Sequence, residues 1–204
     1  MKTTAKCLGL LFVLVLVSVP VMADSFTPYP TPGTQNGATY SFTAATTGNI
    51  TAYFYGSDAS YTSLLGLSIN GAPAVYSTLN NHTSSYGDHY SWAVTAGDSL
   101  VFVLDILTNP PDGTYYSDET MNIGGEQHIY STGFLDDGPP DGIPDGTYVA
   151  FEDRSALSGP MTDWDYNDHE FVFTNIQTIP EPGILLLLGF GMGAVSLVSF
   201  RWKK

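Results

Sequence analysis

The strongest constraint on the fold of this chain is the rhythm of its middle part. There, short runs of β-branched and aromatic residues are interrupted every 8 to 12 residues by Gly, Asn or Asp. No stretch between residues 24 and 180 has a sustained 3.6-residue apolar period, so the pattern predicts strands rather than helices. Many short strands with frequent turns favour an all-β fold, an antiparallel β-sandwich that is jelly-roll-like. The expected strands cover residues 38–45, 49–56, 64–69, 72–77, 99–107, 127–133, 147–151 and 169–174.

Two turns and one loop stand out between these runs. Asn70-Gly71 lies between two of them and predicts a hairpin with a type I′ turn, which needs two residues that tolerate positive φ. Thr95 to Asp98 predicts a tight turn before the buried strand at 99–107. The polar and aromatic segment Val75 to Tyr90 reads as an exposed loop.

The first 23 residues have the plan of a secretory signal peptide. A basic start at Lys2 and Lys6 precedes an apolar run from Leu8 to Val17, and small residues end at Ala23. The apolar run is shorter than the ~20 residues that span a bilayer, so we expect cleavage after Ala23 rather than a retained anchor. Residues 24–37 are rich in Pro, Thr and Gly and read as an extended lead-in to the domain.

A second apolar segment lies near the other end of the chain. Residues 184–200 carry no charge and are followed by the basic end Arg201-Trp202-Lys203-Lys204. This length is near the lower limit for a transmembrane helix. The terminal cations should stay cytoplasmic and leave the preceding domain outside the inner membrane.

The part between the two apolar segments is strongly acidic. Residues 24–180 contain 19 of the 20 acidic residues and a single cation, Arg154, so their formal charge is 1 − 19 = −18. Such a surface excludes nucleic acid as a natural partner and suits divalent cations. The only cysteine, Cys7, lies in the signal peptide, so disulfides cannot stabilise the mature domain.

Carboxylates crowd together between residues 135 and 173. Asp163, Asp165 and Asn167 alternate in a way that can turn several oxygens toward one calcium ion, although the segment is not an EF-hand. A solvated acidic loop is the competing interpretation. A weaker candidate group, on a loop rich in Gly and Pro, comprises Asp136, Asp137, Asp141 and Asp145.

The triplet Phe151-Glu152-Asp153, followed by DWDYNDHEFVF at residues 163–173, resembles the core of the DUF4114 domain. The resemblance covers about residues 127–175. Members of that family are regarded as calcium-site domains without a known enzymatic activity. It implies a calcium site made by Glu152, Asp153, Asp163, Asp165, Asn167 and Asp168.

Pro180-Glu181-Pro182, placed directly before the apolar segment and the basic end, resembles a PEP-CTERM sorting signal. The resemblance implies that residues 176–204 are read by an exosortase, a membrane transpeptidase of bacteria that often make exopolysaccharide. Pro180, Glu181 and Pro182 would then be substrate residues of that enzyme. An ordinary C-terminal anchor that is never cut is the alternative.

The sequence therefore predicts one β-sandwich domain at residues 38–175 in an exported protein of the cell surface or extracellular matrix, with bound calcium and no catalysis. A carbohydrate-binding module of the exopolysaccharide matrix is the first alternative, suggested by 13 tyrosines and 3 tryptophans. A glycoside hydrolase with Glu152 and Asp165 as acid and base is the second. No Gly-x-Ser-x-Gly or His-Glu-x-x-His motif supports an enzyme, and the four histidines lack the spacing of a metal site.

Overall fold

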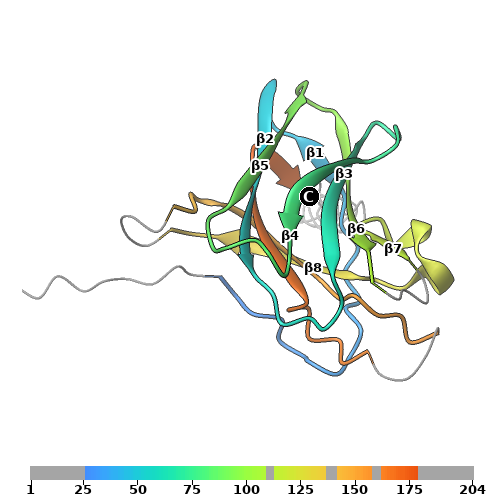
Figure 1. Cartoon of the computed structure of the whole chain (residues 1–204). Helices are drawn as coiled ribbons and strands as arrows, with labels where there is room; N and C mark the ends of the chain where they lie inside the picture. Colours follow the sequence, from blue (N-terminus) through green and yellow to red (C-terminus); the bar gives the residue numbers. More distant parts are fainter. Residues whose placement is uncertain (1–25, 109–112, 137–141, 158–161, 179–204) are drawn as a thin grey trace, which may run out of the picture.

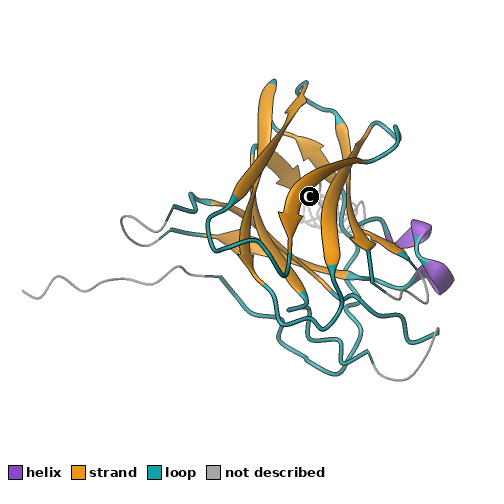
Figure 2. Ribbon diagram, viewed as in Figure 1, coloured by secondary structure: helices purple, strands orange, loops and turns teal. Residues whose placement is uncertain are grey.

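The computed structural model describes residues 26–108, 113–136, 142–157 and 162–178. Within these ranges the chain forms eleven strands in two antiparallel sheets (Figure 1) and two short 3₁₀ turns, which Figure 2 shows together on one side of the strands. The predicted all-β class is confirmed. The predicted signal peptide, its cleavage at Ala23, the Pro180-Glu181-Pro182 motif, the apolar helix and the basic end all lie outside the described residues.

The larger sheet has the strand order β11-β1-β6-β3-β4, and β7 pairs with the second half of β6. Pairing is antiparallel throughout this sheet. Its strands are β1 (Phe42–Ala44), β3 (Ser63–Ile69), β4 (Val75–Asn80), β6 (Ser99–Ile106), β7 (Thr114–Tyr116) and β11 (Ile176–Thr178).

The smaller sheet has the strand order β5-β2-β10-β9-β8 and is also antiparallel. Its last three strands form a meander, in which Phe151 at the end of β9 pairs with His169 at the start of β10. The segment that follows β9 and the segment that precedes β10 therefore meet at one end of the sheet. The strands are β2 (Gly48–Gly56), β5 (His89–Val94), β8 (Ile129–Phe134), β9 (Gly146–Phe151) and β10 (His169–Thr174).

The main core lies between the two sheets. Alternate residues of each strand face inward, because successive side chains of a strand point to opposite faces. Phe102 of β6 stacks on Phe173 of β10 with ring centroids 4.0 Å apart, which joins the sheets across the sandwich. Both rings are fully buried. The inward rows of β2, β3, β6 and β10 supply most of this core.

A second apolar group, the outer cluster, covers the opposite face of the smaller sheet. Strands β8, β9 and β10 contribute to it, and loop residues and half-buried rings pack over them. Phe26 stacks on Tyr148 and Tyr29 packs edge-on against Tyr166, so the lead-in is docked on this face. The buried members are Phe134, Ile143, Tyr148, Ala150, Trp164, Tyr166 and Val172.

Most of the expected turns and strands are found. Asn70 and Gly71 have φ values of 52° and 74°, and the Ala72 amide donates to the Ile69 carbonyl, so the predicted hairpin turn joins β3 to β4. The turn before β6 is closed by the Thr95 amide, which donates to the Asp98 carboxylate at 2.7 Å.

The prediction of an exposed loop from Val75 to Tyr90 is right for residues 82–88 and wrong for both ends of the segment. Its first part is strand β4 and its end begins β5. Ser77 and Leu79 of β4 face the interior, where the Ser77 hydroxyl donates a hydrogen bond to the Leu65 carbonyl. The polar composition of this segment therefore does not reveal that it is a half-buried strand.

Three other departures concern short elements. Only Phe42–Ala44 of the expected strand at 38–45 is paired, and no sequence pattern predicted β7. Strand β11 lies past residue 175, where the domain was expected to end, and pairs with β1. No helix of the described residues is both long enough and apolar enough to cross a membrane.

Candidate metal centre

The acidic residues meet where the meander turns from β9 to β10. Glu152 and Asp153 follow β9 directly, and residues 162–168 lead into β10. The ladder extends past the strand ends, since the Glu152 amide donates to the His128 carbonyl at 2.9 Å and the Asp168 amide donates to the Phe151 carbonyl at 3.2 Å. Both acidic segments are thus fixed to the sheet by backbone hydrogen bonds.

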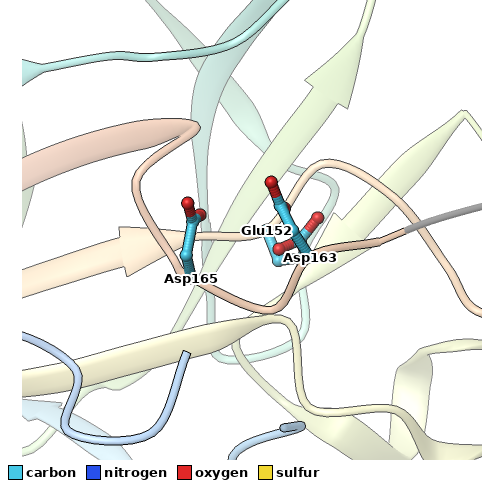
Figure 3. A group of neighbouring side chains, drawn as sticks. All are labelled: Glu152, Asp163 and Asp165. Carbon is cyan, nitrogen blue, oxygen red and sulfur yellow. The ribbon is translucent and has the colours of Figure 1, made fainter. Parts of the chain in front are cut away.

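Residues 163–167 form a loop in which acids and aromatic rings alternate. Trp164 and Tyr166 are buried in the outer cluster, whereas Asp163 is exposed and Asp165 half-buried. Figure 3 shows Asp163, Asp165 and Glu152 as a group, with their carboxylates projecting to the same side of this loop. The aromatic anchors therefore aim the acidic side chains toward Glu152.

This arrangement needs an unusual backbone. Trp164 and Tyr166 have φ values of 48° and 56°, in the left-handed region that bulky residues avoid. Such a conformation costs about 1 to 3 kcal/mol per residue and persists where the surroundings enforce it. Tyr166 is held by two hydrogen bonds, one from the Asn36 amide at 2.8 Å and one to the Gln127 carbonyl at 2.9 Å.

Glu152 lies at the centre of the acidic group and has no exposed surface. Neither of its carboxylate oxygens has a hydrogen-bond partner among the described residues. The Thr162 side chain comes near enough to favour the charged form, yet it does not complete a hydrogen bond with acceptable geometry. A buried, ionised carboxylate without a hydrogen-bond partner is costly unless a positive charge compensates it.

The carboxylates around Glu152 form two sets that could each hold a metal ion. In both sets the oxygens lie within 4.8 Å of one another, close enough for one ion that bonds oxygens at ~2.3 to 2.6 Å. The first set consists of Glu152, Asp163 and Asp165, and the second of Glu152, Asp153 and Asp168. We call these five residues the Glu152 cluster.

The second set is the more enclosed of the two. Asp153 and Asp168 are 4% and 9% exposed, respectively. The Asp168 carboxylate accepts a hydrogen bond from the Asp153 amide at 2.8 Å, and Asp153 lies 3.9 Å from the guanidinium of Arg154. Oδ2 of Asp153 has no hydrogen-bond partner among the described residues.

Burial and the neighbouring negative charges raise the pKa values of the cluster. Burial is the main cause that raises the pKa of Glu152 to about 7 and that of Asp153 to about 6. Burial raises the pKa of Asp168 further, to about 9, and the charges of Asp153 and Glu152 add to the shift. The pKa of Asp165 is also raised, first by burial and then by Asp163. Without a cation the cluster therefore tends to hold protons.

The other predicted site residues have different positions. The side-chain amide of Asn167 donates a hydrogen bond of 2.8 Å to the Asp165 carboxylate and so orients it. In the weaker group, the Asp145 carboxylate accepts from the Asp136 amide at 2.8 Å and closes the loop between β8 and β9. Asp137 and Asp141 lie outside the described residues. The described part of this loop brings no set of three potential ligands together.

Two buried histidines flank the site without belonging to either set. His128 stacks on Tyr115 with centroids 3.9 Å apart, and its Nδ1 lies 3.0 Å from the Glu152 carbonyl. His169 contacts the Ser63 hydroxyl at 2.9 Å across the sandwich, and burial lowers its pKa to about 3. The full burial of His128, which precedes β8, was not expected from the sequence.

The anchoring role of Trp164 and Tyr166 was also missed, although a signal was present. Aromatic residues alternate with acids in DWDYND, which is the pattern of a segment with one apolar and one polar side.

The fold and the acidic cluster together define a β-sandwich protein with a candidate metal centre. Comparison with protein-family models gives no match, and neither do comparisons with curated proteins and with solved structures. The resemblances to DUF4114 and to the PEP-CTERM signal thus rest on the sequence motifs alone.

Proposed function

We propose that this chain is an exported, exosortase-sorted protein of the cell surface or extracellular matrix, whose β domain is stabilised by calcium. The observation that carries the calcium part is the burial of Glu152 with two unpartnered oxygens among four further carboxylates. The ligands are all hard oxygen donors, which suit calcium better than zinc or copper. Export and sorting rest on the two terminal sequence segments.

Thermal unfolding of the full chain in detergent tests the calcium part. A ligand that binds only the native state at 100 times its Kd stabilises it by about 2.7 kcal/mol. For a domain of this size, that corresponds to a rise in Tm of roughly 5 to 10 °C between EDTA and millimolar calcium. An unchanged Tm would contradict a structural calcium site.

The sorting part is tested in a bacterium that carries an exosortase. Glu181→Ala with Pro182→Ala should leave the chain in the inner membrane with its tail uncut, because the recognised tripeptide is gone. Pro32→Ala in the lead-in is the matched control and should be processed normally. Membrane fractionation and mass measurement compare these two variants with the unchanged chain. Equal processing of all three would contradict exosortase sorting.

Carbohydrate binding is the second candidate, and one observation favours it. Tyrosines gather on the outer face of the smaller sheet, where Tyr86 is 42% exposed and packs edge-on against Tyr55. Rings on such a face can stack on sugars. A glycan array probed with calcium present should then show binding that Tyr86→Ala weakens. The hydrolase alternative has less support, because Glu152 has no exposed surface that a glycosidic bond can reach.

We further infer that the sandwich is jelly-roll-like. The chain passes from one sheet to the other between β1 and β2, β2 and β3, β4 and β5, β5 and β6, β7 and β8, and β10 and β11. Repeated crossing of this kind is typical of double-sheet β folds with Greek-key connections. A crystal structure with consecutive strands paired in one closed barrel would contradict this description.

A further inference from the structure

We propose that the Glu152 cluster holds two divalent cations that share the Glu152 carboxylate. This inference rests on the proposed calcium site and adds its stoichiometry and internal organisation. The two sets of ligands have only Glu152 in common, so each has two carboxylates of its own.

The unpartnered oxygens are distributed over both sets. Glu152 is fully buried and contributes two such oxygens, which is enough for one contact to each ion. We call Glu152, Asp153 and Asp168 the inner set, and Glu152, Asp163 and Asp165 the outer set. Oδ2 of Asp153 in the inner set and Oδ1 of Asp165 in the outer set have no hydrogen-bond partner among the described residues. A single ion in either set would leave a buried oxygen of the other without a positive partner.

The charges of the cluster also balance at two ions. Its five carboxylates bring five negative charges when ionised, and Arg154 beside Asp153 returns one positive charge. Two divalent cations supply the remaining four. Arg154 is the only Lys or Arg between residues 24 and 180, so the described domain offers no further cationic side chain of this kind.

The two positions differ in their access to solvent. The inner ligands Asp153 and Asp168 are almost fully buried, whereas Asp163 of the outer set is exposed. The inner ion should therefore exchange slowly and the outer ion quickly, because leaving the inner position requires the loops to open.

The test is to count bound calcium by equilibrium dialysis of the full chain in detergent, with calcium in excess of its Kd. Three variants are compared with the unchanged chain: Asp165→Ala in the outer set, Glu152→Gln at the shared position, and Asp88→Asn as an exposed control outside every candidate group. We expect Asp165→Ala to bind one ion fewer, Glu152→Gln two fewer, and Asp88→Asn the same number as the unchanged chain.

The outcomes separate this inference from the proposed function. One ion per unchanged chain, lost in Glu152→Gln, would overturn the shared pair and leave the calcium site standing. No bound calcium at all would overturn both. If Glu152→Gln does not fold, as judged by circular dichroism, Asp165→Ala decides alone. Loss of both ions, or of none, in that variant would contradict two separate positions.

Discussion

The backbone amide of Asp153 donates a hydrogen bond of 2.8 Å to Oδ2 of Asp168, which joins the segment after β9 to the segment before β10. The side chains of the same two residues are candidate ligands of the inner set. One carboxylate thus fixes the loop and also adds negative charge to the site. The contribution of Asp168 to the stability of the domain should therefore depend on whether that charge is neutralised.

Replacement of Asp168 tests this dependence. In millimolar calcium, Asp168→Ala should lower the free energy of unfolding by about 1 to 3 kcal/mol, since a buried amide loses its acceptor. In EDTA the loss should be smaller, because the variant also removes a carboxylate that Asp153 and Glu152 repel. Urea unfolding in both conditions measures the difference. An equal loss with and without calcium would mean that Asp168 acts only through the hydrogen bond.

The raised pKa values predict how stability responds to pH without metal. Glu152 and Asp168 have pKa values of about 7 and about 9 in the folded domain, above the ordinary value of a carboxyl group. The folded state therefore binds more protons than the unfolded state, so the stability they contribute is complete below pH ~4 and is lost as the pH rises through 7 and 9.

His169 has the opposite effect on the pH dependence of stability, because burial lowers its pKa to about 3. The stability that it contributes is lost as the pH falls below ~6.5. Above pH 6.5 only the carboxylate effect remains. In EDTA, Tm should fall between pH 6.5 and 9, and calcium should abolish most of this fall. A flat Tm in EDTA over this range would contradict the crowded, buried cluster.

The Tyr166 hydroxyl should stabilise the acidic loop from its apolar side. Tyr166→Phe keeps the ring in the outer cluster but removes the hydrogen bonds with Asn36 and Gln127, which should cost about 1 to 3 kcal/mol. Calcium affinity should fall as well, because these two hydrogen bonds help to hold the loop that positions Asp165. Tyr53→Phe, on a ring that packs on the same cluster, is the control and should change stability by less than about 0.5 kcal/mol. Equal effects of the two substitutions on stability would contradict the anchoring role of the Tyr166 hydroxyl.

The hairpin between β3 and β4 offers a test of the fold that is independent of the metal. Gly71 has a φ of 74°, so Gly71→Ala should destabilise the domain by about 1 kcal/mol even though space is available for a Cβ. Gly37→Ala, at a position with an ordinary φ and equally open space, should be close to neutral. Urea unfolding of both variants measures the contrast. A neutral Gly71→Ala would contradict the type I′ turn.

Local patterns were sufficient to predict much of the fold. The runs that became β2, β3, β8, β9 and β10 are rich in β-branched and aromatic residues and are bounded by turn residues. The Asn70-Gly71 turn follows from two residues that tolerate positive φ. Strand β4 was partly mistaken for a loop because Ser77 satisfies its hydroxyl on a backbone carbonyl, so composition hides its burial. Strands β7 and β11 are three residues long, too short for a periodic signal.

The candidate site was predicted only in part, for a physical reason. Carboxylate spacing identified Asp163 and Asp165, but the family resemblance was needed to include Glu152 and Asp153. Their proximity depends on the register between β9 and β10, which pairs Phe151 with His169. The complete burial of Glu152 follows from this tertiary pairing, and local sequence patterns carry no information about it.

Calorimetric titration of calcium into the full chain in detergent tests the central claim most directly. The account predicts micromolar binding that Asp163→Ala combined with Asp165→Ala strongly weakens. The control Asp88→Asn, an exposed residue outside every candidate group, should leave binding unchanged. Absence of binding, or equal binding by the double variant and the unchanged chain, would contradict a calcium site at the Glu152 cluster.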